Sequence, residues 1–301
     1  MLSWHGATPY IPAMKTPLAV VTMTYNEAEL LPVWRSHYAA QVGESACHVI
    51  DHGSDDGSTH DLGRINVLRI PRSPQDDDRR ATAISLYCAA LLQWYDAVIY
   101  VDVDELLVAD PALFPDLVTF AACWPEPIAT ATGFDVIHVD TEETPIDWSR
   151  LVSLQRRWLR FSSAMCKCVL IRQPVVWAPG FHNANILPHF NAPLFLFHLR
   201  YADHDAGIRR LQRTRTQPWA YENAGAHQRM SDMEWSSMLG GMAGLPQNTD
   251  VSLTTDCGDL RHWRDRLLSS TRDRAADRYK LDLHLSGDAL WALPGRFRGR
   301  F

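Results

Sequence analysis

The sequence lacks a long hydrophobic run. No apolar stretch among its 301 residues reaches the roughly 18 residues that a membrane-spanning helix needs. The first residues, MLSWHGATPYIPAMK, also lack the basic-then-apolar order of a signal peptide. We therefore expect a cytoplasmic protein, with residues 1–16 as an N-terminal extension of its folded part.

Basic residues are not in excess either. The formal net charge is −6 at pH 7, whereas a general nucleic-acid surface needs a surplus of Lys and Arg to neutralise phosphates. No nucleic-acid partner is expected, although a local basic pocket remains compatible with this charge. A composition of 46% hydrophobic and 21% charged residues is typical of a globular chain with a substantial core.

Cysteine is scarce and scattered, with six residues in the whole chain. Cys166 and Cys168 form a C-x-C pair, but no second pair accompanies it, so the spacing does not favour a structural zinc site. Buried free thiols are expected instead. No internal repeat or low-complexity linker divides the chain.

What the sequence does contain is an alternation of strand-like and helix-like segments. Short apolar runs predict strands, and longer stretches with helical spacing predict helices between them. Such alternation predicts an α/β fold with a mostly parallel sheet flanked by helices. The first strand is expected within 18–27, a run that ends in polar residues, and further strands at 47–51, 65–70 and 97–101, with helices at 30–42 and 78–95. Two later segments, 133–140 and 192–200, are also strand-like.

Polar side chains follow three of these strands. Asn26 follows the first, Asp51 ends the second, and Asp102, Asp104 and Glu105 end the strand AVIYV. Because ligands in such folds bind beyond the carboxyl ends of the strands, we expect these side chains to share one crevice. A single acidic turn is more often a solvated strand end, but three strand ends of this kind favour a site.

Crowded carboxylates repel one another unless a cation lies among them. Oxygen ligands suit Mg²⁺ or Mn²⁺, and these ions usually complete their coordination with substrate phosphates. The sequence therefore predicts a divalent cation at Asp102 and Asp104.

Three motifs in this order, TMTYNEAELLPVW, VIDHGSDDGST and VDVDELL, resemble the nucleotide-sugar half of a GT-A glycosyltransferase of the family 2-like group. With the later KCVLIR, PGFH and FHLRYAD, the D-x-D-E form is similar to the branch related to family 92. The likeness covers roughly residues 17–220. It implies a GT-A (Rossmann-like) fold, a nucleotide-sugar donor such as a UDP-sugar, a divalent metal and a hydroxyl acceptor on a glycan or glycolipid.

The resemblance also assigns roles to residues. It implies a metal held by Asp104, by Asp102, which is shared with the ribose, and by a late histidine, His198. Lys167 is expected to pair with the diphosphate, ahead of neighbouring arginines that include Arg156 and Arg160. The nucleobase and ribose contacts are expected from Thr24, Tyr25, Asn26, Glu27 and Asp51.

The catalytic base is harder to assign, because the acidic pair expected after the D-x-D motif is absent. We predict His182, exposed by a Pro-Gly turn, with Asp135 as the carboxylate alternative. Glu105 is as compatible with a structural as with a catalytic role. An inverting hexosyl transfer is expected.

Beyond residue 205 the pattern becomes helical. We predict a GT-A domain over 17–205 and a helical C-terminal extension over 206–301 that caps the acceptor site. The basic end, WALPGRFRGRF, is compatible with contact with the inner membrane face, but a frayed basic tail is the preferred interpretation. Two other functions stay open, a nucleotidyltransferase and a noncatalytic nucleotide-sugar-binding protein; the first usually carries a Gly-rich basic loop, which TMTYNEAELL lacks.

Overall fold

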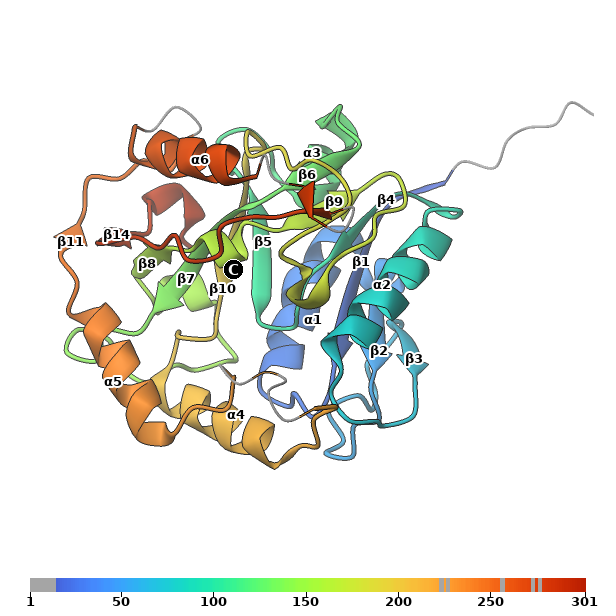
Figure 1. Cartoon of the computed structure of the whole chain (residues 1–301), viewed down its shortest axis with the longest axis horizontal. Helices are drawn as coiled ribbons and strands as arrows, with labels where there is room; N and C mark the ends of the chain where they lie inside the picture. The colour runs from blue at the N-terminus through green and yellow to red at the C-terminus, as the bar shows by residue number, and fades with distance from the viewer. Residues whose placement is uncertain (1–14, 222–224, 226–227, 255–257, 272–273, 276–277) are drawn as a thin grey trace, which may run out of the picture.

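A computed structural model describes residues 15–221, 225, 228–254, 258–271, 274–275 and 278–301 (Figure 1). Nearly all of the expected N-terminal extension, 1–16, lies outside these residues. Strands and helices alternate in the first part of the chain, as predicted. They are β1 (Thr16–Thr24), α1 (Leu30–Val42), β2 (Cys47–Asp51), β3 (Asn66–Arg69), α2 (Asp77–Leu91), β4 (Tyr95–Tyr100) and β5 (Glu105–Ala109).

The first sheet has the strand order β3-β2-β1-β4-β9-β6. Strands β3, β2, β1 and β4 are parallel, whereas β9 (Cys168–Ile171) and β6 (Ile128–Thr130) join in antiparallel pairs. The prediction of an α/β protein with parallel strands is therefore confirmed for the first half of the chain.

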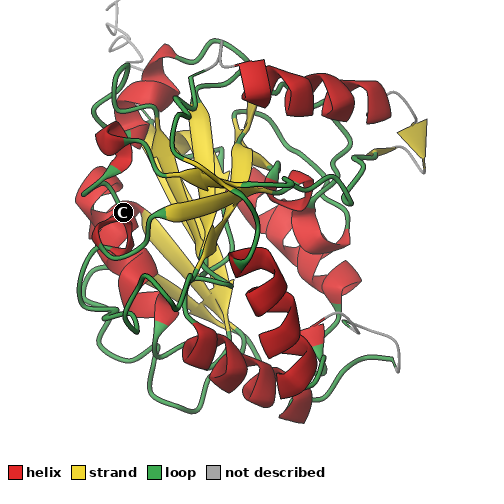
Figure 2. Ribbon diagram, turned by 90° about the vertical axis from the view of Figure 1, so that its left-hand side faces the viewer, coloured by secondary structure: helices red, strands yellow, loops and turns green. Residues whose placement is uncertain are grey.

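Both faces of this sheet are covered, which explains why β1 is buried without interruption from Leu18 to Thr24. Neighbouring side chains on a strand point to opposite faces. Val20 belongs to the apolar cluster that contains Trp34 of α1, whereas Val21 belongs to the cluster that contains Ile84 of α2. A parallel sheet needs this double cover, because each of its faces is hydrophobic. Figure 2 shows helices on both sides of the strands.

A second six-stranded sheet, with the order β11-β14-β8-β7-β10-β5, was not predicted. Only its β11–β14 and β7–β10 pairs are parallel. One mostly parallel sheet is thus the wrong description of the whole chain. The strands that join β5 here are β7 (Thr132–Ile137), β8 (Trp158–Phe161), β10 (Leu194–His198), β11 (Gln247–Asn248) and β14 (Leu290–Ala292).

The C-terminal part contains helices and also completes the second sheet. Strand β14 pairs with β8, so this part is more than a helical cap. The short strands Arg274–Ala275 (β12) and Arg278–Tyr279 (β13) form a separate pair. The remaining helices are α3 (Leu117–Cys123), α4 (His204–Thr216), α5 (Asp232–Ala243) and α6 (Gly258–Ser270).

The end of the chain is not a frayed tail. The rings of Phe297 and Phe301 are buried, and Arg296 forms an ion pair with Asp110 at 2.8 Å. The interpretation as a frayed tail is therefore wrong, because the first and last residues of FRGRF, Phe297 and Phe301, anchor the segment in the core. The rings of Phe297 and Phe301 are therefore not exposed at the surface.

Four of the described cysteines, 47, 88, 166 and 168, are buried free thiols, as predicted, whereas Cys123 is exposed. Among the described helices, none combines the length and the apolar character that crossing a membrane would require.

Candidate functional site

Three of the predicted site residues lie in one row across the second sheet. Glu105 on β5 is opposite His198 on β10, and His198 is opposite Asp135 on β7. Residues directly opposite one another on paired strands point to the same face. Strand register therefore brings together side chains that are up to 93 positions apart in the sequence (198 − 105).

This row borders a cavity of about 830 Å³, which also receives Asp102, Asp104 and Lys167. Its walls come from the end of β1, the turn after β4, the start of α2 and one face of α4. The volume lies within the range of about 300–1,000 Å³ that is common for small-molecule sites. A crevice therefore lies beyond the ends of β1 and β4, but Asn26 and Asp51, which were expected to share it, do not line it.

Asp102 is surrounded by donors. Its carboxylate accepts hydrogen bonds from the Tyr100 hydroxyl at 2.8 Å, from the Arg80 guanidinium and from the Lys167 ammonium at 3.3 Å. Burial alone would raise the pKa of Asp102, but Arg80 and then Lys167 hold it well below its usual range. Two cations of the chain thus occupy the carboxylate that we predicted to be shared between ribose and metal.

Both oxygens of Glu105 are also engaged. Oε1 accepts from Lys167 Nζ at 2.5 Å, and Oε2 accepts from the Asp102 main-chain N–H at 3.0 Å. Burial raises the pKa of Glu105, against the effect of Lys167. These contacts fix the turn after β4, which favours the structural over the catalytic role considered for Glu105.

Asp104, His198 and Asp135 form a chain of contacts. His198 Nδ1 lies 2.7 Å from Asp135 Oδ1, and His198 Nε2 lies 3.3 Å from Asp104 Oδ2. Burial would lower the pKa of His198, but Asp104 and Asp135 together raise it to about 9. Without a bound ion, both ring nitrogens can therefore donate, Nδ1 to Asp135 and Nε2 to Asp104, and a metal ion at Nε2 would have to displace the proton there.

The donor set at this point fits a metal ion in part. In the portion of the chain that the structure describes, no group of three or more His, Cys, Asp or Glu side chains is arranged to hold one. Asp104 and His198 nevertheless present an oxygen and a nitrogen 3.3 Å apart. Asp135 binds the other ring nitrogen, as outer carboxylates do at many metal-bound histidines. Two protein ligands are enough for ions that take their remaining ligands from phosphates and water.

The cations opposite these carboxylates were missed in the sequence. Arg210 of α4 contacts Asp104, and its Nε donates to Glu27 at 3.0 Å. Arg213, one turn further on, contacts Glu27 at 2.7 Å. Residues three apart share a helix face, so the spacing of Arg210 and Arg213 could have indicated a basic face. Arg80, at the start of α2, carried no comparable signal.

Three of the four residues expected at the nucleobase line the cavity, namely Thr24, Tyr25 and Glu27. The Arg72 guanidinium stacks over the Tyr25 ring, with its Cζ 3.7 Å from the ring centroid. Asn26 does not line the cavity, because its backbone is left-handed at φ 53° and its amide donates to a neighbouring loop. The buried Thr24 hydroxyl has no hydrogen-bond partner among the described residues.

Asp51 lies outside the cavity lining. Its carboxylate is buried and accepts from the Ser54 main-chain N–H at 2.7 Å, the Thr59 hydroxyl at 3.0 Å and Arg69 at 2.6 Å. These contacts organise the loop after β2. The structure therefore does not bring Asp51 together with the other predicted donor contacts.

His182 lines the cavity and has one nitrogen engaged with the main chain. Nδ1 donates to the Ala164 carbonyl at 2.6 Å. Burial and then Lys167 lower the pKa of His182 to about 3, so the ring is neutral. A Cβ at Gly180 would lie 2.9 Å from Nε2, so the glycine leaves room for the ring.

Arginines considered for the diphosphate have structural partners instead. Arg156 is buried and lies 3.3 Å from Asp203, and Arg160 donates to the Gly287 carbonyl at 2.8 Å. Neither lines the cavity.

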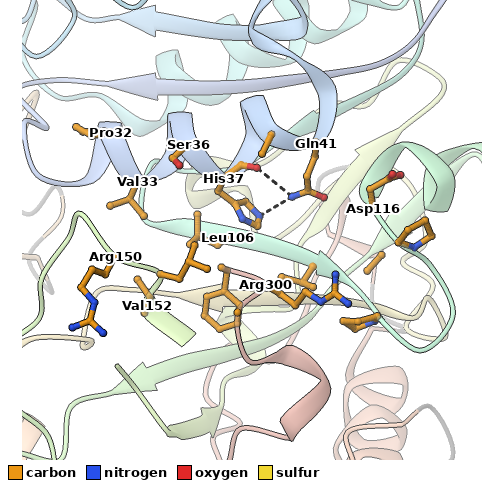
Figure 3. Close-up of a pocket in the computed structure, with 18 of the residues that line it drawn as sticks. Pro32, Val33, Ser36, His37, Gln41, Leu106, Asp116, Arg150, Val152 and Arg300 are labelled. Carbon is orange, nitrogen blue, oxygen red and sulfur yellow. Dashed lines mark hydrogen bonds between the residues drawn. The ribbon is translucent and has the colours of Figure 1, made fainter. Parts of the chain in front are cut away.

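A second cavity, of about 540 Å³, lies on the other face of β5 (Figure 3). Leu106 lines it, whereas the neighbouring Glu105 lines the first cavity. Its polar groups have internal roles: His37 Nε2 contacts the Leu107 carbonyl at 2.8 Å, and Asp116 caps α3. It is separate from the candidate site.

The sequence matches no protein-family model and no curated protein. Its structure is similar to that of the mannosyltransferase PcManGT from Pyrobaculum calidifontis in complex with GDP-Man and Mn²⁺, with 13% identity, 76% of this chain and 74% of that chain covered, and a TM-score of 0.34. The structure of the bifunctional glycosyltransferase WbbM matches with 12% identity, 44% of this chain and 25% of that chain covered, and a TM-score of 0.27. The structure of mannose-1-phosphate geranyltransferase from Thermus thermophilus matches with 13% identity, 76% of this chain and 65% of that chain covered, and a TM-score of 0.30. Likeness at these scores is too low to establish a shared fold or function.

Proposed function

We propose that this protein is a glycosyltransferase that uses a nucleotide-sugar donor. One observation carries the proposal: acidic and basic side chains converge at the carboxyl ends of parallel strands, in a cavity of about 830 Å³. Asp104, with its partner His198, supplies the ligand pair for a divalent cation, and Arg80, Lys167 and Arg210 supply positive charge for a diphosphate. A crevice at such strand ends is the usual ligand position in open α/β sheets.

The donor is proposed to lie with its diphosphate at Lys167 and Arg210 and its nucleobase near Tyr25. The pairing of Tyr25 with Arg72 offers a flat surface on which a base can stack. A UDP-sugar is our choice of donor, on the motif resemblance. Bound Mn²⁺ or Mg²⁺ would act as a Lewis acid that stabilises the charge developing on the departing diphosphate.

The acceptor is proposed to be a hydroxyl of a glycan or glycolipid, activated by His182. The Nδ1–H bond to Ala164 fixes the tautomer in which Nε2 carries a lone pair. Asp135 is the weaker candidate for the base, because His198 already occupies one of its oxygens. Transfer with inversion requires a base on the sugar face opposite the diphosphate.

Product analysis tests the function directly. Incubation with nucleotide-sugars and Mn²⁺ should release nucleoside diphosphate in step with sugar transfer. Release of pyrophosphate would instead identify a nucleotidyltransferase, and binding without any release would identify a noncatalytic nucleotide-sugar-binding protein. Thermal shift with each nucleotide-sugar selects the donor, because a ligand at 100 times its Kd stabilises the folded state by about 2.7 kcal/mol.

Asp104→Asn tests the metal position independently of the acceptor. The variant should fold normally, because Arg210 keeps Glu27 and His198 keeps Asp135 as partners. It should lose the metal-dependent part of UDP binding, by about 10–100-fold. His198→Ala should weaken the same coupling less. Calorimetric titration of UDP with and without Mn²⁺ measures both, and metal-independent UDP binding in the wild type would contradict a metal at Asp104.

A further inference from the structure

Arg210 holds the position at Asp104 where a metal ion would bind. Its guanidinium contacts Asp104 Oδ2, the same oxygen that lies 3.3 Å from His198 Nε2. A cation bound between Asp104 and His198 would therefore compete with a permanent positive charge. An arginine cannot relieve such a conflict by deprotonation, because it keeps its proton at all physiological pH values.

We propose that Arg210 is a displaceable internal cation, which occupies the metal position at Asp104 until the donor binds. This inference rests on the proposed function. Without nucleotide, Arg210 neutralises Asp104 and lowers the affinity for a divalent ion. When the diphosphate enters, the guanidinium exchanges Asp104 for phosphate oxygens, which its planar fork binds well. Metal and nucleotide then bind together.

The surroundings of Arg210 favour such an exchange. Its side chain is 25% exposed and lines the cavity, whereas the Asp104 side chain is only 7% exposed. Arg210 Nε also donates to Glu27, so the guanidinium stays attached to the β1 end while its other nitrogens change partner. Glu27 in turn keeps Arg213 at 2.7 Å.

The same geometry predicts the consequence of removing Arg210. Asp104 would retain His198, and Glu27 would retain Arg213, so no buried charge is left alone. Arg210→Met should therefore fold, and its circular dichroism and thermal midpoint can verify this. Arg210→Lys, which keeps one charge without the fork, serves as a second variant.

The experiment is a Mn²⁺ titration followed by the electron paramagnetic resonance signal of free Mn²⁺, with and without UDP. Without UDP, Arg210→Met should bind Mn²⁺ at least about tenfold more tightly than the wild type, with Arg210→Lys in between. With UDP, the factor by which nucleotide raises metal affinity should fall, and by linkage the reciprocal factor falls equally. Arg213→Met is the matched control, since this arginine contacts Glu27 but not Asp104.

Asp104→Asn separates this inference from the proposed function. If Asp104→Asn loses Mn²⁺ binding while Arg210→Met matches the wild type, the gating role of Arg210 is wrong and the metal position stands. If Arg213→Met raises the affinity as much as Arg210→Met, general charge removal explains the result and the inference also fails. If Asp104→Asn binds Mn²⁺ and UDP like the wild type, the metal position at Asp104 and the gating role of Arg210 both fail, whereas the glycosyltransferase function is decided separately by product analysis.

Discussion

His182 combines a fixed orientation with a free nitrogen. Its Nδ1–H donates to the Ala164 carbonyl, and Nε2 has no hydrogen-bond partner in the described part of the chain. The low pKa, about 3, reflects burial and the charge of Lys167 before any donor is present. A diphosphate near Lys167 would offset that charge, so the ring should become a stronger base when the donor is bound.

His182→Ala should therefore lower turnover by about 10²–10⁴-fold while donor binding persists. Steady-state rates at saturating donor, together with calorimetric UDP titration, separate the two effects. His60→Ala is a suitable control, because His60 is exposed and lies outside the cavity lining. Near-normal turnover in His182→Ala would transfer the role of base to another residue.

Single residues could be predicted where the signal was local. Asp102, Asp104 and Glu105 follow a buried strand within four positions, and the structure places all three at the cavity. Their partners could not be read in the same way. Arg80 is 22 positions from Asp102, and Arg210 is 106 positions from Asp104. Nothing in the sequence links such pairs, because the contact exists only after the sheet and α4 have packed.

The helices of the first half could be predicted because the residues that they bury recur at helical spacing. The helix predicted at 30–42 is α1, with the same bounds. The helix predicted at 78–95 ends earlier, at Leu91, because the chain must turn before β4 begins at Tyr95. The second sheet was harder to predict, since its strands span two to six residues and pair across long distances. Short apolar runs do not identify their partners.

The packing of α4 on α5 depends on a glycine. A Cβ added at Gly207 would lie 2.1 Å from the Trp235 ring, which is fully buried. Gly207→Ala should force the helices apart and destabilise the protein by about 1–3 kcal/mol, as overpacking does. Urea unfolding measures this change.

Gly240 of α5 provides the matched control, because a Cβ there meets nothing within 4 Å. Gly240→Ala should stabilise the protein by about 0.5–1 kcal/mol, since alanine loses less backbone entropy in a helix. If both substitutions change the free energy of unfolding equally, the close approach of α4 and α5 is wrong.

The last residues of the chain pack into the main apolar cluster of the molecule. Phe297 and Phe301 share one apolar cluster with Val20 of β1 and Phe197 of β10. The Phe301 carbonyl accepts from the Ser153 hydroxyl at 2.6 Å. The sequence did not predict this, because WALPGRFRGRF is basic and glycine-rich. Only the burial of Phe297 and Phe301 shows that the segment belongs to the core. The proposed boundary at residue 205 therefore falls between segments that share a sheet and a cluster.

Buried histidines should make the stability of the whole molecule depend on pH. His48 lies between the Tyr87 and Tyr95 hydroxyls at 3.0 and 3.2 Å, and burial lowers its pKa from 6.5 to about 4. The unfolded chain then binds a proton near pH 6.5 that the folded protein does not. The contribution of neutral His48 is complete above pH 6.5 and is lost as the pH falls towards 4.

For His48 this loss should reach about 1 kcal/mol between pH 7.5 and 5.5. His198, with its raised pKa, acts in the opposite direction, so the informative quantity is the difference between variant and wild type. The free energy of unfolding of His48→Gln, measured by urea at both pH values, should fall less on acidification than that of the wild type. His60→Gln, at an exposed site, should follow the wild type. Parallel pH profiles for wild type and His48→Gln would show that His48 takes up its proton equally in both states, and that the interface between β2, α2 and β4 is open to water.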